Sequence, residues 1–360
     1  MSKLLERLWY DDSRSVPLTL ARAPLWMASL GFGAGVSVRN ALYDRGLFAG
    51  HRIEGARIIS VGNLNVGGAG KTQVAIFLLQ ELVSRGLRAA VLSRGYGRRS
   101  TQPVSFSRSD GDLPPASETG DEPLLIAHRC PHVRVHVGAD RVALARRAVA
   151  EGAQVLVLDD GMQHRRLARD EDLVVLDEAV GLGNGAMLPA GPLREPVSSL
   201  RRASVLWLRA SERAKERARE EESPVRRLLP TTLPVIRARH APSDVLLPDG
   251  TLAHPDILKG HRVHLLSALA RPGSFRRTAE SLGAEVIGET VRPDHHPWRE
   301  DELQLALTAA RRENSLLLTT EKDRVKLPPN AEVHTVRLGV ELLSGREHLE
   351  RLLAGEPTSG

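Results

Sequence analysis

Apolar and polar residues follow one another along this chain in two repeating patterns. Short, nearly continuous apolar runs are typical of parallel strands that are buried on both faces. Longer segments with apolar positions at helical spacing lie between these runs. The runs that predict strands lie at 58–61, 89–93, 155–158, 173–176, 204–208, 263–268, 284–288 and 316–320. Because strands and helices alternate, the sequence predicts an α/β fold with a mostly parallel sheet and helices on both faces.

The same pattern divides the chain into three parts. We expect an N-terminal helical segment at 1–50, a core at 51–167, and a smaller α/β domain with a linker at 168–360 that closes over the active site. Charges of both signs alternate densely at 211–227, which indicates a solvated helix or connector. The stretch 100–115 is rich in polar residues, proline and glycine and predicts a loop. Rearranged connections are expected around the prolines at positions 224, 230, 234, 242 and 248.

The first predicted strand leads into a glycine-rich turn that is typical of phosphate-binding loops. A helical apolar stripe follows it and ends near Gly86. Glycine lets backbone N–H groups approach phosphate oxygens, and the helix N-terminus adds positive potential. In such a loop Lys71 reaches the terminal phosphates, and the Thr72 hydroxyl is placed for Mg²⁺. The turn therefore predicts a P-loop NTPase-like core that binds a nucleoside triphosphate through Asn65, Val66, Gly67, Gly68, Ala69, Gly70, Lys71 and Thr72.

One position departs from the general phosphate-loop pattern. The pattern requires glycine five residues before Gly70, where this chain has Asn65. Asparagine tolerates left-handed backbone better than most residues, so we expect the chain to turn there as well. The alternative is a glycine-rich turn with a surface lysine, but the strand before it and the helix after it favour phosphate binding.

Two carboxylates end the apolar run at 155–158. These are Asp159 and Asp160, and Gln163 and His164 follow within a few residues. In a phosphate-loop protein the acid at the end of a strand holds Mg²⁺, directly or through water. The doublet therefore predicts a magnesium site, with an amide and an imidazole delivered to the same edge of the sheet.

Composition narrows the possible partners. Lys and Arg number 50 against 44 Asp and Glu, so the formal net charge is +6, which favours nucleic acid, an anionic membrane surface or a phosphorylated substrate. Aromatic residues make up only 3% of the chain, which argues against a surface for base stacking. Cys130 is the only cysteine, which excludes a disulfide framework and a thiolate metal cluster and fits a reducing compartment.

The longest uncharged run lies near the N-terminus, at 23–38. As a helix it would reach roughly 24 Å, which is short of the ~30 Å hydrocarbon core of a bilayer. Its apolar bulk between flanking arginines suits a helix that lies in the interface of an anionic membrane. A helix packed on its own domain is the alternative, and the residues leave both open. The apolar residues of this run are Leu25, Trp26, Met27, Leu30 and Phe32.

Three further segments carry candidate chemistry. Arg94 and Tyr96 follow the strand at 89–93, where open α/β sheets bind ligands, although a solvated basic turn is equally compatible. Asp121 and Glu122 lie at a predicted helix start, where carboxylates often serve only as caps. Two adjacent histidines occupy positions 295 and 296, but no further metal ligands follow at the spacing of a zinc site. A catalytic or ligand-contacting role for these histidines is therefore a better interpretation than zinc binding.

Taken together, these segments resemble the tetraacyldisaccharide 4′-kinases, or lipid A 4′-kinases. That family also lacks glycine at the position of Asn65. The likeness extends from about residue 58 to residue 320. The segments that resemble the family are 60–72, 93–97, 120–123, 159–164, 188–195 and 294–296.

The resemblance implies transfer of the γ-phosphate of ATP to the 4′-hydroxyl of a tetraacylated disaccharide 1-phosphate in lipid A synthesis. Lys71 and Thr72 would hold phosphates and Mg²⁺, with Asp159 and Asp160 as the magnesium-side acids. Asp121 would then be the catalytic base rather than a cap. His295 would pair with it across a cleft between the domains and meet it only when they close. Active-site positions with substrate-binding or supporting roles would be Arg94, Tyr96, Glu122, Arg141, Gln163, His164 and Arg194.

Because the acceptor of that family is a membrane lipid, the resemblance favours peripheral docking of residues 1–50. The expected place is the cytoplasmic face of the inner membrane of a Gram-negative-type bacterium, without nucleic acid or an obligate protein partner. A first rival is a deviant phosphate-loop switch ATPase or GTPase that acts on a protein. Such proteins carry a lysine where this chain has Val66. A second rival, a non-enzymatic adaptor, leaves the carboxylate doublet unexplained.

Overall fold

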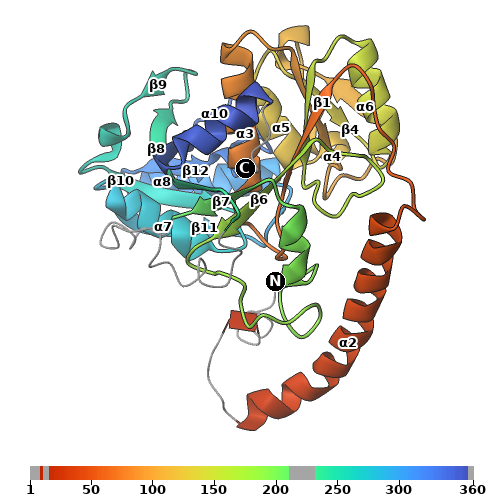
Figure 1. Ribbon diagram of the computed structural model, residues 1–360. Coiled ribbons are helices and arrows are strands. Elements are labelled where there is room, and N and C mark those ends of the chain that lie inside the picture. Colours follow the sequence, from red (N-terminus) through yellow and green to blue (C-terminus); the bar gives the residue numbers. More distant parts are fainter. Residues whose placement is uncertain (1–8, 11–15, 211–231, 356–360) are drawn as a thin grey trace. The chain divides into compact units, whose positions relative to one another are not determined.

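The computed structural model describes residues 9–10, 16–210 and 232–355, with side chains of the first long helix from residue 24 onward. The charged stretch expected at 211–227 therefore lies outside the described residues. Figure 1 gives the course of the chain. Its predicted fold class, a mostly parallel sheet with helices, is confirmed.

The chain forms two compact units, and each unit combines segments that are distant in the sequence. The first unit comprises Met1–Arg94, Gly138–Arg239 and Glu341–Gly360, and the second comprises Gly95–Val137 and His240–Val340. The boundary expected at residue 167 coincides with neither division. Since buried contacts rather than sequence order define a compact unit, the chain enters and leaves each unit more than once.

The first unit is built on parallel strands in the order β8-β7-β6-β1-β5-β2. These are β1 (Arg57–Gly62), β2 (Ala89–Ser93), β5 (Val155–Asp159), β6 (Glu171–Asp177), β7 (Val205–Arg209) and β8 (Val235–Leu246), of which residues 235–239 belong to this unit. Strands β1 and β5 are in register, with Val61 opposite Asp159. This register brings the end of the phosphate-loop strand beside the carboxylate doublet.

Helices α3 (Lys71–Ser84) and α6 (Arg141–Ala150) cover this sheet through their apolar stripes. The unit also contains α2 (Val16–Asp44), α10 (Arg346–Ala354) and the 3-10 turn η2 (Val197–Arg202). Helix α6 packs through Val142 and Ala145 on Ile58 of β1 and Leu156 of β5. Helix α3 also contacts β1, β2 and β5. Asp140 caps α6, because its side chain accepts hydrogen bonds from the first N–H groups of the helix.

The second unit contains parallel strands in the order β11-β10-β12-β13 and an antiparallel pair, β3 and β4. Its strands are β3 (Val104–Phe106), β4 (Arg134–Val137), β9 (Leu252–Ala253), β10 (Arg262–Ser267), β11 (Glu285–Val291), β12 (Leu316–Thr320) and β13 (His334–Ser344). Its helices are α4 (Ala116–Thr119), α5 (Asp121–Arg129), α7 (Pro272–Ser281), α8 (Glu300–Arg312), α9 (Glu321–Arg324) and the 3-10 turns η1 (Arg108–Asp110) and η6 (Pro255–Leu258). This unit has two apolar clusters, one that contains Leu266 and one that contains Leu265. Both residues belong to β10, where successive side chains point to opposite faces of the sheet.

One expectation about the local structure is wrong, and one strand was not predicted. The stretch 100–115 contains β3 and η1 besides loop, since β3 pairs with β4, a partner that is remote in the sequence. The proline-rich region contains β8, a strand of 12 residues. Residues 235–238 of this strand pair with β7 and residues 245–246 pair with β9. Pro242 lies between those two stretches, where its missing N–H is tolerated.

Candidate active site

The glycine-rich turn lies between β1 and α3 in the first unit. Gly67 and Gly70 have positive φ angles of 116° and 87°, a conformation that favours glycine. Helix α3 begins directly afterwards, at Lys71, and its N-cap is Gly70. Because glycine has no side chain to accept a hydrogen bond, the first N–H groups of the helix remain available to an anion.

Asn65 does not adopt the left-handed backbone expected of it. Among non-glycine residues of the described chain, positive φ occurs at Asp160, His295 and Asn314. Asn65 is instead buried, and its Nδ2 donates to the carbonyl oxygen of Gly181 at 2.8 Å. The amide thus ties the phosphate loop to a neighbouring segment, which glycine could not do.

Lys71 lies in a cluster of charged side chains. Its Nζ donates to Oδ1 of Asn63 at 2.9 Å and lies 3.2 Å from Oδ1 of Asp160. Arg194 donates to both oxygens of the same carboxylate, at 2.8 and 2.9 Å, and also to Oδ1 of Asn63. Burial alone would raise the pKa of Asp160, but the hydrogen bonds from Arg194 and the charge of Lys71 lower it well below its ordinary value. Asp160 is therefore ionised at neutral pH.

The two carboxylates after β5 have different partners. Asp159 is buried, and Ser93 at the end of β2 donates to its Oδ2 at 3.2 Å. Asp160 follows with a φ of 52°, which a residue other than glycine rarely adopts, and its side chain meets Lys71 and Arg194 instead. Strained backbone of this kind is concentrated at functional sites, which supports a functional role for the doublet.

The predicted supporting residues Arg141, Gln163 and His164 also belong to the first unit. Arg141 is buried, and its Nη1 lies 3.5 Å from Nδ1 of His164. Gln163 donates to the backbone oxygen of Asn63 at 3.1 Å. Burial, followed by the charges of Arg141 and two further arginines, lowers the pKa of His164 to about 4. This imidazole is therefore neutral at pH 7 and is not an additional cation in the site.

The donor set of this unit fits a magnesium ion bound together with phosphates. Within the described part of the chain no group of three His, Cys, Asp or Glu side chains could enclose a metal ion. Mg²⁺ in phosphate-transfer sites uses one or two carboxylates and leaves its other positions to water and substrate oxygens. Asp159, Asp160 and the Thr72 hydroxyl are oxygen donors of this kind.

A carboxylate–imidazole pair occupies the second unit. Asp121 is the first residue of α5, and its Oδ2 lies 3.0 Å from Nδ1 of His295. Asp121 is not the cap of this helix, because Gly120 holds that position. A side chain at Gly120 would meet the backbone oxygen of Tyr96 at 2.9 Å. The tight approach of this glycine to residue 96 thus sets where α5, and with it Asp121, begins.

Two lysines lie close to the pair of Asp121 and His295. Nζ of Lys322 lies 3.2 Å from Nε2 of His295 and 2.9 Å from Oδ1 of Asp294. Lys326 is buried, and its Nζ lies 3.8 Å from Oδ2 of Asp121. The neighbouring His296 has a separate partner, because its Nε2 lies 2.8 Å from Glu302.

The prediction that Asp121 and His295 pair across a cleft between two domains is wrong. Both residues belong to the second unit, and their side chains are within hydrogen-bonding distance inside it. Their wide separation in the sequence reflects the course of the chain, which leaves this unit at Val137 and returns at His240. The pair therefore does not require closure of two domains to assemble.

The remaining predicted residues are less enclosed. Arg94 is exposed at the end of β2, and Glu122 is half-buried in the first turn of α5. Tyr96 is 73% exposed, and its ring stands edge-on to that of His295, with centroids 5.5 Å apart.

Four functional candidates were missed by sequence reasoning. Asn63 and Ser93 end two parallel strands of the first unit, a position that often contacts ligands. Lys322 and Lys326 lie four residues apart after β12, a spacing that puts both on one face of a helical turn. A search for polar residues at or directly after the end of each predicted strand would have found Asn63, Ser93 and Lys322, but not Lys326, which lies beyond α9.

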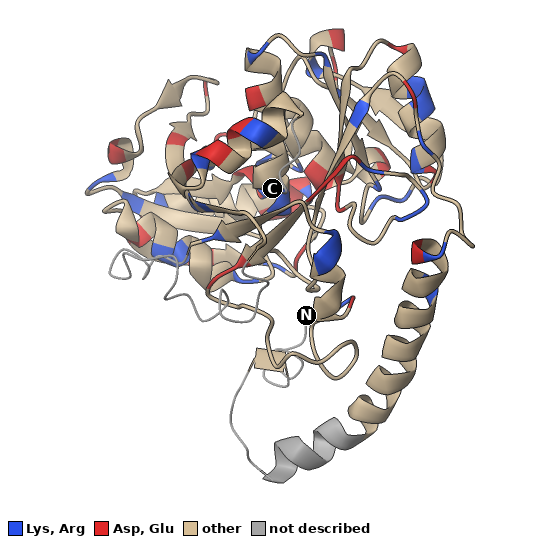
Figure 2. Ribbon diagram, viewed as in Figure 1, with Lys and Arg blue, Asp and Glu red and all other residues tan. Residues whose placement is uncertain are grey.

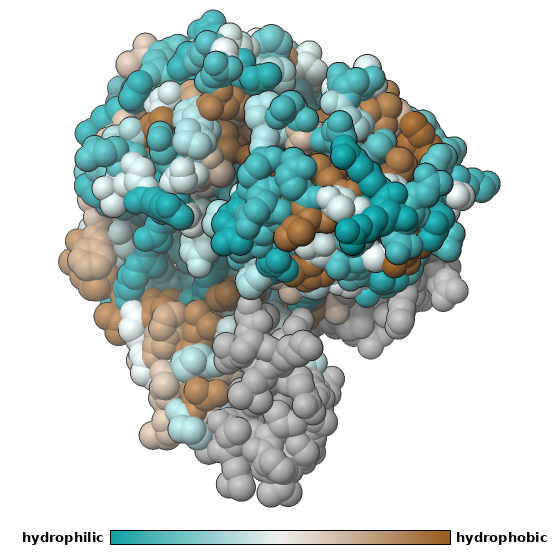
Figure 3. All heavy atoms as spheres, turned by 180° about the vertical axis from the view of Figure 1, so that it is seen from behind, coloured by the Kyte–Doolittle hydropathy of each residue, from teal (hydrophilic) through white to brown (hydrophobic). Residues whose placement is uncertain are grey.

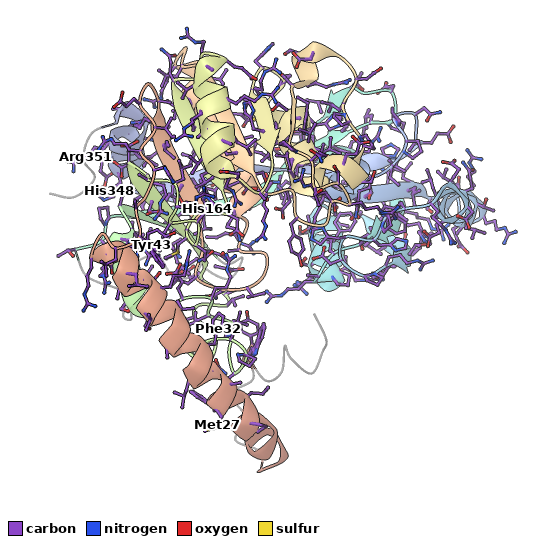
Figure 4. The ribbon with its side chains drawn as sticks, turned by 90° about the vertical axis from the view of Figure 1, so that its right-hand side faces the viewer. Met27, Phe32, Tyr43, His164, His348 and Arg351 are labelled. Atoms are coloured by element: carbon purple, nitrogen blue, oxygen red, sulfur yellow. The ribbon has the colours of Figure 1, made fainter. Side chains whose placement is uncertain are left out.

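Helix α2 exposes apolar side chains. Residues 24–38 carry no charge, as Figure 2 shows. Met27 is 73% exposed and Leu30 is 65% exposed, and Figure 3 shows apolar residues gathered on this surface. Figure 4 shows Met27 and Phe32 along the helix. No helix within 16–210 or 232–355 is both long enough and apolar enough to cross a membrane.

Polar contacts hold α2 to the rest of its own unit. Ser29 donates to the backbone oxygen of Met187 at 2.9 Å, and Nδ2 of Asn40 donates to Glu195 at 2.8 Å. Arg39 donates to the backbone oxygen of Gln163 at 2.6 Å. The helix is therefore anchored to the segments that also carry the phosphate-loop site.

Comparison with known proteins gives one consistent result. The sequence profile of the family described as LpxK, tetraacyldisaccharide-1-P 4′-kinase, matches residues 21–356. A tetraacyldisaccharide 4′-kinase from Anaeromyxobacter sp. (strain Fw109-5) is 48% identical over 97% of this chain and 95% of that protein. A tetraacyldisaccharide 4′-kinase from Syntrophus aciditrophicus (strain SB) is 40% identical over 90% of this chain and 89% of that protein.

A solved structure is also similar. It is the crystal structure of the "apo" form of LpxK from Aquifex aeolicus in complex with ATP. Its sequence is 32% identical, the TM-score is 0.75, and the match covers 93% of this chain and 98% of that chain.

Proposed function

This chain belongs to the tetraacyldisaccharide-1-P 4′-kinase family, and from that premise we propose how its residues carry out the reaction. The chain transfers the γ-phosphate of ATP to the 4′-hydroxyl of a tetraacyldisaccharide 1-phosphate in lipid A synthesis. The cluster of Lys71, Asp160 and Arg194 after a glycine turn is the observation that carries the assignment of roles.

Lys71 and the N–H groups at the start of α3 hold the phosphates of ATP. Phosphoryl transfer depends mainly on positioning and on neutralising the charge of the transferred group. Arg194 is a second cation beside Lys71, and its planar fork matches the geometry of carboxylate and phosphate oxygens. When nucleotide binds, we expect Arg194 to exchange part of its pairing with Asp160 for phosphate.

Asp159, Asp160 and Thr72 are the residues that would hold Mg²⁺. The ion would neutralise negative charge that develops on the phosphates during the transfer. Asp160 is ionised at neutral pH and therefore needs no deprotonation to act as a ligand.

Asp121 accepts the proton of the acceptor hydroxyl. Its Oδ2 is occupied by His295, which leaves Oδ1 to face the incoming hydroxyl. Arg94, Tyr96 and Glu122 lie near the ends of β2 and α5 and are proposed to contact the anionic disaccharide.

The exposed apolar face of α2 docks on the membrane that holds the lipid substrate. Its uncharged stretch carries Trp26 and Met27, and arginines follow at positions 39 and 45. Amphipathic helices with apolar bulk beside basic residues bind the interface of anionic bilayers. We propose peripheral association with the cytoplasmic face of the inner membrane.

The reaction is tested with labelled ATP, Mg²⁺ and a detergent-dispersed tetraacyldisaccharide 1-phosphate. The expected product carries a second phosphate at the 4′ position, identified by mass spectrometry and ³¹P NMR. Hydrolysis of ATP at the same rate with and without lipid, and no bisphosphorylated product, would favour a switch ATPase instead.

A further inference from the structure

We propose that Lys322 is a positioning residue that selects the tautomer of His295 and so orients Asp121. The inference rests on the proposed role of Asp121 as the base. All residues concerned belong to the second unit, so the argument depends on contacts within that unit alone.

The fold places Lys322 firmly. Helix α9 follows β12, and the side chain of its N-cap, Thr320, accepts a hydrogen bond from the N–H of Asp323. Asp323 is fully buried and also accepts from Nε1 of Trp298 at 3.1 Å and from the N–H of Ala268 at 3.1 Å. Lys322 therefore projects from a helical turn that the core of the unit anchors.

Asp294 provides the second anchor. Its Oδ1 lies 2.9 Å from Nζ of Lys322. Burial alone would raise the pKa of Asp294, but the hydrogen bond and charge of Lys322 lower it, so the pair is ionic at neutral pH. The Lys322 ammonium is thereby held 3.2 Å from Nε2 of His295.

The chemistry of these groups permits one arrangement of protons. An ammonium group has three N–H donors and no acceptor. At 3.2 Å from Lys322, Nε2 of His295 therefore has to accept, and the ring proton resides on Nδ1. Nδ1 then donates to Oδ2 of Asp121, 3.0 Å away. The other tautomer would set two donors against each other at Nε2 and two acceptors against each other at Nδ1.

The remaining groups around the imidazole agree with this arrangement. Oδ2 of Asp294 lies 3.7 Å from Nε2, too far for a hydrogen bond. The ring of Tyr96 is T-shaped to the imidazole, with the two centroids 5.5 Å apart. Lys326 approaches Asp121 itself, with Nζ 3.8 Å from Oδ2. His295 also has a φ of 62°, a rare backbone conformation that fixes the direction of its side chain.

The consequence for catalysis is one of orientation. With Nδ1–H donating to Oδ2, the carboxylate of Asp121 is fixed and Oδ1 stays free for a hydroxyl proton. Holding a base in its productive geometry is a separate contribution from accepting the proton. Lys322 touches the imidazole and not the reacting atoms, so it acts through His295.

The tautomer is tested directly on the full chain by ¹⁵N NMR of the imidazole nitrogens, with His295→Gln used to assign the signals. The expected spectrum of the natural chain shows a protonated Nδ1 and an unprotonated Nε2. In Lys322→Met, whose thioether has no N–H donor, a protonated Nε2 is expected to appear. Lys322→Arg retains the original pattern, because guanidinium is also only a donor.

Kinetics provide the second measurement. Lys322→Met is expected to lower kcat by about 10-fold or more, within the 10²–10⁴-fold that a general base contributes, with the KM for ATP unchanged. Lys322→Arg recovers most of the loss. Lys259→Met, at an exposed lysine of the same unit, serves as the matched control and leaves kcat unchanged.

Three results would each overturn the inference. They are a protonated Nε2 in the natural chain, the same tautomer in Lys322→Met as in the natural chain, and an unaltered kcat in Lys322→Met. Absence of any lipid phosphorylation by the natural chain would instead overturn the proposed function, and the NMR experiment would still decide the tautomer.

Discussion

At the residue scale, the function depends on how neighbours set the state of a few carboxylates. Asp160 is held ionised by Lys71 and Arg194, whereas Asp121 has an imidazole on one oxygen. Asp121 starts α5, and Asp160 directly follows β5. The difference arises from the cations and rings that the fold brings to each one.

Replacement of Asp121 by alanine is expected to lower kcat by about 10²–10⁴-fold, the usual contribution of a general base. ATP binding should persist, because the phosphate loop belongs to the first unit. Steady-state kinetics and calorimetric titration with ATP measure the two effects. Glu118→Ala, at an exposed acid nearby, is the matched control. A kcat of Asp121→Ala equal to that of the natural chain would show that Asp121 is not the catalytic base.

The depressed pKa of Asp160 predicts a pH dependence of stability. Since the pKa is lowered in the folded state, the carboxylate stabilises the fold above its unfolded value near 3.8, and this contribution is lost as the pH falls further. The natural chain should therefore be more stable than Asp160→Asn at pH 7, and the difference should shrink below pH 4. Urea unfolding at pH 7, 5 and 3 tests this, and a difference that grows towards pH 3 would contradict it. Because the Asp160 side chain is 39% exposed, solvent screening keeps the effect modest.

At the element scale, each site is positioned by the ends of strands and the starts of helices. The strand β1, the glycine turn and the helix α3 present Lys71, and β5 presents the carboxylate doublet. In open α/β sheets ligands bind outside the carboxyl ends of the strands, and in the first unit the glycine turn and the carboxylate doublet follow β1 and β5 at such ends. Helix α2 differs, because it leaves apolar side chains in contact with solvent.

Charge on the exposed face of α2 should weaken membrane binding. Met27→Glu combined with Leu30→Glu is expected to reduce co-sedimentation with anionic vesicles by about tenfold or more, because each change removes apolar burial and adds repulsion. Leu305→Glu, at a leucine of α8 with 69% exposure, is the matched control. Equal sedimentation of both variants would show that α2 is not the docking surface. Activity on detergent-dispersed lipid should change little.

At the scale of the whole molecule, the two chemical tasks are divided between two compact units. The residues proposed to bind phosphate and magnesium lie in one unit, and the carboxylate–imidazole pair lies in the other. Each unit is assembled from segments that are far apart in the sequence. In the proposed mechanism the reaction uses residues of both units, and each unit builds its own group of side chains from its own residues.

ATP should stabilise the first unit by mass action. At a concentration 100 times Kd, a ligand that binds only the folded state adds about 2.7 kcal/mol to the free energy of unfolding. Scanning calorimetry should show an ATP-dependent rise in the transition of that unit for the natural chain and for Asp121→Ala. Lys71→Ala should show almost none, and an undiminished rise in this variant would contradict the role of Lys71.

Local patterns were sufficient for the strands and helices on which the sites stand. The runs at 58–61, 89–93 and 155–158 became β1, β2 and β5, because a buried parallel strand has to be apolar on both faces. The strand β8 was not predicted, since Pro242 interrupts it and its pairing partners are remote in the sequence. The domain boundary also differed from the predicted one, because contacts between segments that are remote in the sequence define the two units.

The sequence by itself determined the phosphate loop, the carboxylate doublet and the alternation of strands and helices, because each of these depends on neighbours within a few residues. The tertiary structure decided which distant residues share a unit. It brought His295 to Asp121, Lys322 to His295, and Arg194 to Asp160. Contacts of this kind depend on the packing of strands and helices that are more than 20 residues apart, and no local pattern records them.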